Sequence, residues 1–344
     1  MQRWKNRPPG SNWGDFGDED QRGRLNYLTP EVVRRAVGEV REGLTFCLSL
    51  PLDLPGGSVL NPRRFPPRIE YSMRGEDPVI NFPMSVVNPG QTDVVCDDRV
   101  TLSTQYSTQW DSLAHFGAVF DADADGTPEI VYYNGYRAGE HVVGPFDYLD
   151  GRKSHEGPYG AHALGIENMA AACVQGRGVM IDLMFHFGTE LRAVSYDDLM
   201  KVIEADNIVI GRGDILCLRT GFDRLLIGHA GNPPAGIATS TCCHLDGSDE
   251  ALLKWIDRSG IAAIVSDTEG VEFLPAKKPG PSGTRVPLHE LCLFKLGIHL
   301  GEMFLLSDLA DWLRSKGRHS FLLTAPPLRL PRAVGSPVTP VATV

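Results

Sequence analysis

The second half of the chain repeats one pattern, in which a short apolar strand alternates with a helix of about ten residues. Four apolar, β-branched runs are typical of buried strands, at 178–183, 214–219, 261–266 and 298–304. Helices are predicted between them, at 195–206, 249–259 and 288–296. Ser195 and Gly260 stand where a helix N-cap and a C-terminal glycine are expected. Strands that alternate with helices predict an α/β fold rather than a β-sandwich.

The first half is less regular. Residues 1–28 lack apolar periodicity and contain Trp4 and Trp13, so they are predicted to form an extended N-terminal arm before a single domain at 29–344. The two tryptophans need cover, and we expect the arm to pack across a neighbouring subunit in a homo-oligomer, a dimer or tetramer. The proline-rich stretch 51–93 is predicted to be a long loop that borders the active site. Strands are expected at 100–106 and 130–133.

Composition and charge argue against nucleic-acid and membrane partners. The formal net charge is -10 and the basic residues are scattered in short pairs such as Arg63-Arg64, which read as solvated surface and argue against nucleic-acid binding. No apolar run of 20 residues and no charged-then-apolar leader is present, so we expect a cytoplasmic protein with no membrane span. The seven cysteines show no CxxC spacing and are expected to be reduced thiols.

Polar clusters follow three of the predicted strands, at 105–115, 267–272 and 289–302. Ends of strands are where α/β proteins place their sites. In the first cluster Asp111 and His115 are four residues apart, so on a helical turn they would share one face. Such a pair would share a metal or form a carboxylate–imidazole pair, although a surface hydrogen bond is the commoner explanation.

The third cluster contains His289 and Glu302. The helix at 288–296 advances roughly 13 Å, and the strand that follows returns a similar length, so the two side chains meet at one end of the sheet. Glu302 lies within an apolar run, and burying a lone carboxylate costs several kcal/mol unless a metal or a cation pairs with it. The alternatives are a helix-capping role for His289 and an exposed edge position for Glu302.

These segments resemble the cyclase family, which includes kynurenine formamidases and isatin hydrolase, and the similarity spans 11–340. The family motif is His-x-Gly-Thr-His-x-Asp-x-Pro-x-His, and here that window reads Gln-Tyr-Ser-Thr-Gln-Trp-Asp-Ser-Leu-Ala-His. Thr108, Asp111 and His115 match the motif, whereas Gln105 and Gln109 replace its two leading histidines. The Thr-Gln-Trp-Asp form is typical of a longer branch of the family. The resemblance implies a swivelling β/β/α domain that is usually oligomeric.

The resemblance also implies a metal site. In the family the histidines and the aspartate bind zinc or manganese together with a later His and Glu, which correspond to His289 and Glu302. The implied ligands are therefore Asp111, His289 and Glu302, with Gln105 and Gln109 at the remaining positions. Glutamine can ligate only through a neutral carbonyl oxygen, which favours manganese over zinc and allows magnesium. A weak or absent metal is the alternative.

The implied function is metal-dependent hydrolysis of a small cyclic or acyclic amide, lactam or lactone. A divalent ion lowers the pKa of bound water and polarises a carbonyl, and His115, beside Asp111, is the predicted general base and later acid. Trp110, Trp13 and Thr108 are predicted to contact this small-molecule substrate. Two alternatives stay open: a lyase, cyclase or dehydratase that uses His115 for proton transfer, and a non-catalytic member of the family.

Overall fold

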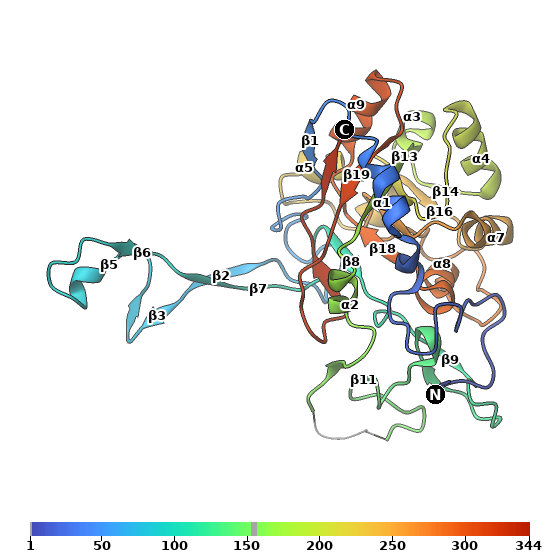
Figure 1. The fold of residues 1–344 in the computed structure, drawn as a ribbon, viewed down its shortest axis with the longest axis horizontal. Helices are drawn as coiled ribbons and strands as arrows, with labels where there is room; N and C mark the ends of the chain where they lie inside the picture. Colours follow the sequence, from blue (N-terminus) through green and yellow to red (C-terminus); the bar gives the residue numbers. More distant parts are fainter. Residues whose placement is uncertain (1, 153–156) are drawn as a thin grey trace.

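A curled nine-stranded sheet forms the centre of the computed structural model, which describes residues 2–152 and 157–344 (Figure 1). The strands lie in the order β1 (Thr45–Cys47), β21 (Val341–Thr343), β19 (Ser320–Thr324), β13 (Gln175–Asp182), β15 (Ile215–Arg219), β17 (Ala263–Ser266), β18 (His299–Glu302), β8 (Gln109–Asp111) and β20 (Gly335–Pro337). The pairs from β13 to β18 are parallel, and the pairs outside them are antiparallel. The predicted α/β fold is confirmed.

Both faces of the parallel strands are buried, which explains their continuous apolar sequences. In β13, Val179 and Ile181 pack on one face and Met180 on the other. The first face is covered by α4 (Tyr196–Ala205), α7 (Glu250–Ser259) and α8 (Pro287–His289), which continues as a helical segment over Glu290–Leu296. The second face is covered by α2 (Ile166–Ala171) and α9 (Ser307–Ser315). The sheet is therefore the middle layer of three.

Shorter elements connect these layers. The remaining helices are α1 (Pro30–Val37), α3 (Leu183–Phe187), α5 (Phe222–Gly228) and α6 (Ile237–Ser240), with 3₁₀ turns at Gly23–Tyr27, Met84–Val86 and Tyr133–Gly135. Two-stranded ladders pair β9 (Ala118–Phe120) with β10 (Glu129–Val131), β11 (Val142–Val143) with β12 (Gly160–Ala161), and β14 (Arg192–Val194) with β16 (Cys243–Leu245). Within the described residues, no helix combines the length and the apolar character needed to cross a membrane.

The caps predicted for two helices are present. The Ser195 side chain accepts from the backbone N–H of Asp198 and forms a capping box with it, and Gly260 ends α7 in the left-handed region at φ 70°. The strand expected over 100–106 is present only in part, because β7 covers Asp98–Thr101. The chain leaves its strand at Thr101, because the pairing partner of this segment ends there.

The N-terminal segment packs on its own chain. The Trp13 indole N–H donates to the Phe294 carbonyl at 2.8 Å, and its ring meets the Phe294 ring edge-on at 5.2 Å. Trp4 packs against Trp13, and both side chains are buried. The helical segment at 290–296 therefore covers Trp13, where we expected a neighbouring subunit to do so. The contact joins segments far apart in the chain, so the local sequence pattern does not predict it.

A long hairpin projects from the body instead (Figure 1). Its root pairs β2 (Arg68–Tyr71) with β7 (Asp98–Thr101), and beyond them lie two short ladders, β3 (Met73–Arg74) with β4 (Asp77–Pro78) and β5 (Phe82–Pro83) with β6 (Val94–Val95). Most of its apolar side chains are exposed. The expected irregular loop at 51–93 is therefore wrong for this part of the chain, which forms a ribbon.

Candidate functional site

The antiparallel pairing of β8 with β18 brings two predicted site segments together. Gln109 lies opposite Glu302 in the register, and Trp110 lies opposite Gly301. Side chains of a strand alternate between its faces, so Gln109 and Asp111 point to one face and Trp110 to the other. On the first face the Gln109 Nε2 donates to Glu302 Oε2 at 2.7 Å.

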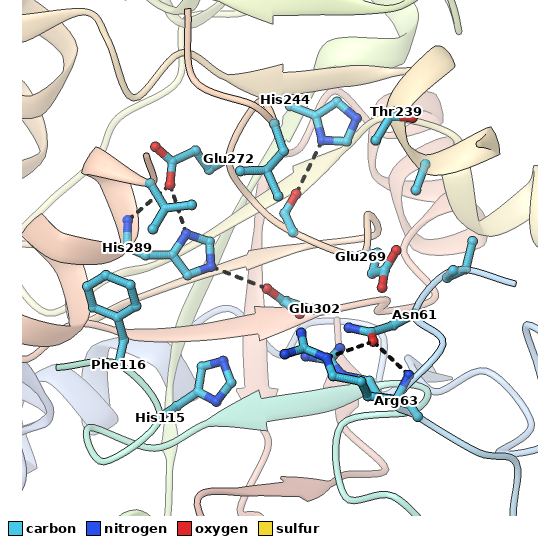
Figure 2. A pocket seen from close by; sticks show the side chains of 16 residues that line it. Asn61, Arg63, His115, Phe116, Thr239, His244, Glu269, Glu272, His289 and Glu302 are labelled. Atoms are coloured by element: carbon cyan, nitrogen blue, oxygen red, sulfur yellow. Dashed lines mark hydrogen bonds and ion pairs between the residues drawn. The ribbon is translucent and has the colours of Figure 1, made fainter. Parts of the chain in front are cut away.

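Three predicted ligands converge on this face. One ligand atom each of Asp111, His289 and Glu302 lies within 4.8 Å of the others, and His289 Nε2 is 3.8 Å from Glu302 Oε1. Figure 2 shows the His289 ring directed at Glu302 across the site. Glu302 is buried rather than exposed at a sheet edge. Two carboxylates and an imidazole gathered in this way form a candidate site for a divalent cation.

Glu272 holds His289 in place. Its Oε2 accepts from His289 Nδ1 at 2.8 Å (Figure 2). Its Oε1 accepts from the backbone N–H of Leu288 at 2.8 Å. A carboxylate on Nδ1 leaves Nε2 free to ligate, which is the usual arrangement of metal-binding histidines. The sequence places Glu272 in a polar cluster but gives it no role, because the contact closes across a long loop between β17 and α8.

The two glutamines support the ligands through their amide nitrogens. Gln105 Nε2 donates to Asp111 Oδ1 and lies 2.8 Å from His115 Nδ1. Gln109 Nε2 donates to Glu302, and its Oε1 is buried with no hydrogen-bond partner among the residues that the structure describes. The two carboxylates and the imidazole form a donor set that fits a hard or borderline divalent ion, and the unpartnered Gln109 amide oxygen is a further neutral donor on the strand that carries Asp111.

His115 reaches the site by a different route from the one predicted. Asp111 ends β8, and a turn closed by the His115 N–H donating to the Ser112 carbonyl at 3.0 Å brings the imidazole back. His115 Nε2 is then 3.8 Å from Asp111 Oδ2. The pair is therefore formed by a strand and a turn, not by one face of a helix, and the His115 ring remains partly exposed to the cavity.

The electrostatics of the site show an excess of buried negative charge. Burial, with the charge of Asp111 adding to it, raises the pKa of Glu302. Burial and the charge of Glu302 raise the pKa of Glu269 to about 7. Burial acts to lower the pKa of the His289 imidazole, but the hydrogen bonds with Glu272 and Glu302 outweigh it and raise that pKa to about 10. A divalent cation would offset this excess.

A cavity of about 410 Å³ opens over the cluster (Figure 2). Its polar lining comes from the ligand cluster and the loop after β17, from α6 and β16, and from the chain before the hairpin. The residues are Asn61, Arg63, Arg64, His115, Thr239, His244, Glu269, Glu272, His289 and Glu302. Its apolar lining includes Leu60, Phe116, Ala238, Leu274 and Val286. The predicted loop over 51–93 therefore borders the site only through residues 60–64.

Three residues predicted to contact the substrate do not line this cavity. Trp110 lies on the opposite face of the sheet, where its indole N–H donates to the Ala325 carbonyl at 2.9 Å. Trp13 is buried in the core away from the cavity lining. Thr108 is also buried, and its hydroxyl donates to the Met303 carbonyl at 2.6 Å, which fixes the turn after Glu302. Alternation along β8 would have placed Trp110 behind the sheet.

A second acidic group lies on the loop between β9 and β10. Asp121, Asp123 and Glu129 each offer an oxygen within 4.8 Å of the others. Arg137 pairs with Glu129 at 3.2 Å, and the group borders a different cavity from the one above the His289 cluster. We therefore regard it as a surface loop whose charge is partly neutralised.

Comparisons with known proteins identify the family to which the chain belongs. A family model described as a cyclase matches residues 47–273. A solved structure described as a novel cyclase is 30% identical, with a TM-score of 0.73, and the match covers 97% of this chain and 99% of that chain. No curated protein matches.

Two more distant structures share the fold. Isatin hydrolase A from Labrenzia aggregata, bound to benzyl benzoate, is 17% identical with a TM-score of 0.53, and the match covers 92% of this chain and 98% of that one. Isatin hydrolase A from Ralstonia solanacearum is 14% identical with a TM-score of 0.52, covering 90% and 93%. The family model spans well over half of the chain, and the chain is therefore a member of the cyclase family.

Proposed function

We propose that the protein is a metal-dependent hydrolase of a small cyclic or acyclic amide, lactam or lactone. The observation that carries the proposal is the convergence of Asp111, His289 and Glu302 at the base of a cavity of about 410 Å³. Manganese is the favoured ion, because the set is rich in carboxylate oxygens and contains one imidazole. The isatin hydrolases of the same fold support a hydrolytic reaction.

Some side chains around the cluster hold the ligand side chains in place, and His115 transfers a proton. A divalent ion bound by Asp111, His289 and Glu302 would supply Lewis acidity and lower the pKa of water. Glu272 holds the His289 ring, and Gln109 holds the Glu302 carboxylate. These hydrogen bonds keep the donor atoms oriented before the substrate arrives, which avoids reorganisation during the reaction.

His115 is the proposed proton carrier. The ionised Asp111 carboxylate can only accept hydrogen bonds, so the Gln105 amide must turn its N–H₂ group toward it. The same Nε2 also lies 2.8 Å from His115 Nδ1, and it can only donate to that atom. Nδ1 therefore accepts, and the neutral imidazole carries its proton on Nε2. In this tautomer the Nε2–H can donate a hydrogen bond to the leaving nitrogen or oxygen. A neutral imidazole is too weak an acid to release that proton, so His115 acts as a general acid only after the ring has gained a second proton as imidazolium. The general-base role expected from the motif would require the opposite tautomer.

The experiment that tests the function combines metal content with turnover. Purified protein is loaded with manganese, its metal content is measured by mass spectrometry, and a panel of lactams, aryl amides and lactones is followed by chromatography. We expect one tightly bound ion and hydrolysis of at least one class. Protein that holds no metal and hydrolyses none of the panel would overturn the proposal.

His115→Ala is the matching variant. We expect turnover to fall about 100- to 10,000-fold, because positioned acid–base groups contribute that much. The fold should persist, since the His115 side chain is partly exposed and lies at the cavity wall. His229→Ala removes an exposed histidine after α5 and serves as the control. Activity of His115→Ala equal to that of the control would remove His115 from the mechanism.

A further inference from the structure

Arg64 has an unusual position on the cavity wall. It is half-buried and lines both the main cavity and a small adjoining one that it shares with Tyr106 and Glu269. Within residues 2–152 and 157–344, no acceptor lies within hydrogen-bond distance of its guanidinium and no carboxylate lies within ion-pair distance. A guanidinium taken partly out of water normally finds such a partner, so Arg64 is prepared for a group that comes from outside the chain.

The neighbouring arginine differs in just this respect. Arg63 is exposed, and its Nε donates to the Asn61 side-chain oxygen at 3.4 Å, an acceptor that also receives the Arg63 backbone N–H at 3.1 Å. Figure 2 shows Asn61 and Arg63 together on the wall below Glu269. The two arginines carry the same charge on the same segment, so they form a matched pair of which only one lacks a partner.

The charges of the cavity restrict where an anion can bind. Glu269, Glu272 and Glu302 line it on the sheet side, and they repel a negatively charged ligand. The positive charge of Arg64 reaches the same space, because it opposes the rise in the pKa of Glu269 that burial and then Glu302 produce. An anionic group inside the cavity is therefore favoured where it contacts the Arg64 guanidinium directly, because that contact offsets the repulsion from the carboxylates.

We propose that Arg64 binds a carboxylate on the substrate, so that the hydrolysed amide or lactam belongs to the class of small aromatic or aliphatic acids. The planar guanidinium offers two parallel N–H groups to a carboxylate, which an ammonium cannot do. Phe116, Leu274 and Val286 on the same cavity contact the hydrocarbon part of such a molecule. The substrate class in this inference rests on the proposed hydrolase function, whereas the binding of a carboxylate by Arg64 does not.

Benzoate and benzamide form the pair of probes, because they have the same shape and differ in charge. Their dissociation constants are measured by calorimetry on the manganese-loaded protein and on the variants Arg64→Ala, Arg64→Lys and Arg63→Ala. Arg64→Ala should weaken benzoate binding about 10- to 100-fold, the loss expected for a charged hydrogen-bonded pair. Arg64→Lys should recover part of the affinity, and Arg63→Ala should change it less than threefold. Benzamide binding should be the same in all four proteins.

Other results would overturn the proposal. Equal benzoate affinity in the parent and Arg64→Ala would mean that the carboxylate binds elsewhere, for instance on the metal. Equal losses in Arg63→Ala and Arg64→Ala would show a general charge effect rather than a site. The benzoate measurement needs no turnover, so it tests the subsite separately from the reaction. If the parent hydrolyses none of the substrates but Arg64→Ala weakens benzoate binding, the hydrolase proposal is refuted and the carboxylate subsite is retained. If the parent hydrolyses a substrate but Arg64→Ala binds benzoate as tightly as the parent does, the subsite is refuted and the hydrolase proposal is retained.

Discussion

Gln105 and Gln109 stand where the motif implied by the family resemblance has histidines, and the amide changes what those positions do. Each amide nitrogen donates to a carboxylate, Asp111 or Glu302, so each side chain holds a ligand in place. An imidazole has no second N–H on one nitrogen to share between Asp111 and His115, as Gln105 Nε2 does. The two positions therefore act on the metal site through its ligands, and the buried Gln109 Oε1, which has no hydrogen-bond partner among the described residues, is a candidate for a direct contact.

The double variant Gln105→His/Gln109→His tests this arrangement. Zinc should bind more tightly than in the parent, because an imidazole is a better donor to zinc than an amide oxygen. Turnover should not rise and should fall about 10- to 100-fold, since groups that orient metal ligands carry effects of that size. Zinc affinity is measured by competition with a chromogenic chelator, with Gln91→His on the hairpin as control. Unchanged zinc affinity in a folded double variant would mean that these positions do not face the metal.

At the scale of single elements, β18 contains a histidine, His299, that the site does not use. His299 is buried in the middle of the sheet, and its Nδ1 has no hydrogen-bond partner among the described residues. Burial lowers the pKa of the imidazole to about 3. In the unfolded chain a histidine titrates near pH 6.5. Below that pH the unfolded chain gains a proton that the folded chain does not, so folding stability is complete above about pH 6.5 and falls as the solution becomes more acidic.

The variant His299→Leu removes this dependence at similar volume. Between pH 7.5 and pH 5 the parent should lose about 2 kcal/mol more free energy of unfolding than the variant, from a difference of about 1.5 pH units at roughly 1.4 kcal/mol each. Urea unfolding followed by circular dichroism at both pH values measures it. His229→Leu, on an exposed histidine, should leave the pH dependence of the parent unchanged. An equal loss in the parent and His299→Leu would show that His299 does not titrate on unfolding.

The sequence predicts elements well where the signal is local. The capping box at Ser195, the glycine after α7 and the buried strands around Val179 depend on neighbours in the chain, and all are present. The predicted helical turn from Asp111 to His115 is wrong because strand pairing with β18 outweighs the local spacing. Glu272 and Arg64 could not be assigned roles, since their surroundings depend on loops that close over long distances.

At the scale of the whole molecule, the hairpin is the part that the body does not stabilise. A two-stranded ribbon is marginally stable alone in water, and this one carries many exposed apolar side chains, including Met73, Val86 and Val94. The N-terminal segment no longer needs a partner, because Trp4 and Trp13 are buried in their own chain. The expected homo-oligomer therefore has a different candidate contact, the tip of the hairpin at 72–97, and a second copy of the chain is the partner we propose for it.

Truncation of this tip tests the assembly without disturbing the site. Tyr71 lies opposite Asp98 in the register, so replacing 72–97 by Asn-Gly closes β2 and β7 with a two-residue turn that suits antiparallel strands. Light scattering after size exclusion should give a dimer or tetramer for the full chain and a smaller species for the truncated one. Circular dichroism and metal content should match the parent, because the cavity is lined only by residues 60–64 of this region. A monomeric full chain, or an oligomer of unchanged mass after truncation, would place the subunit contact elsewhere or remove it.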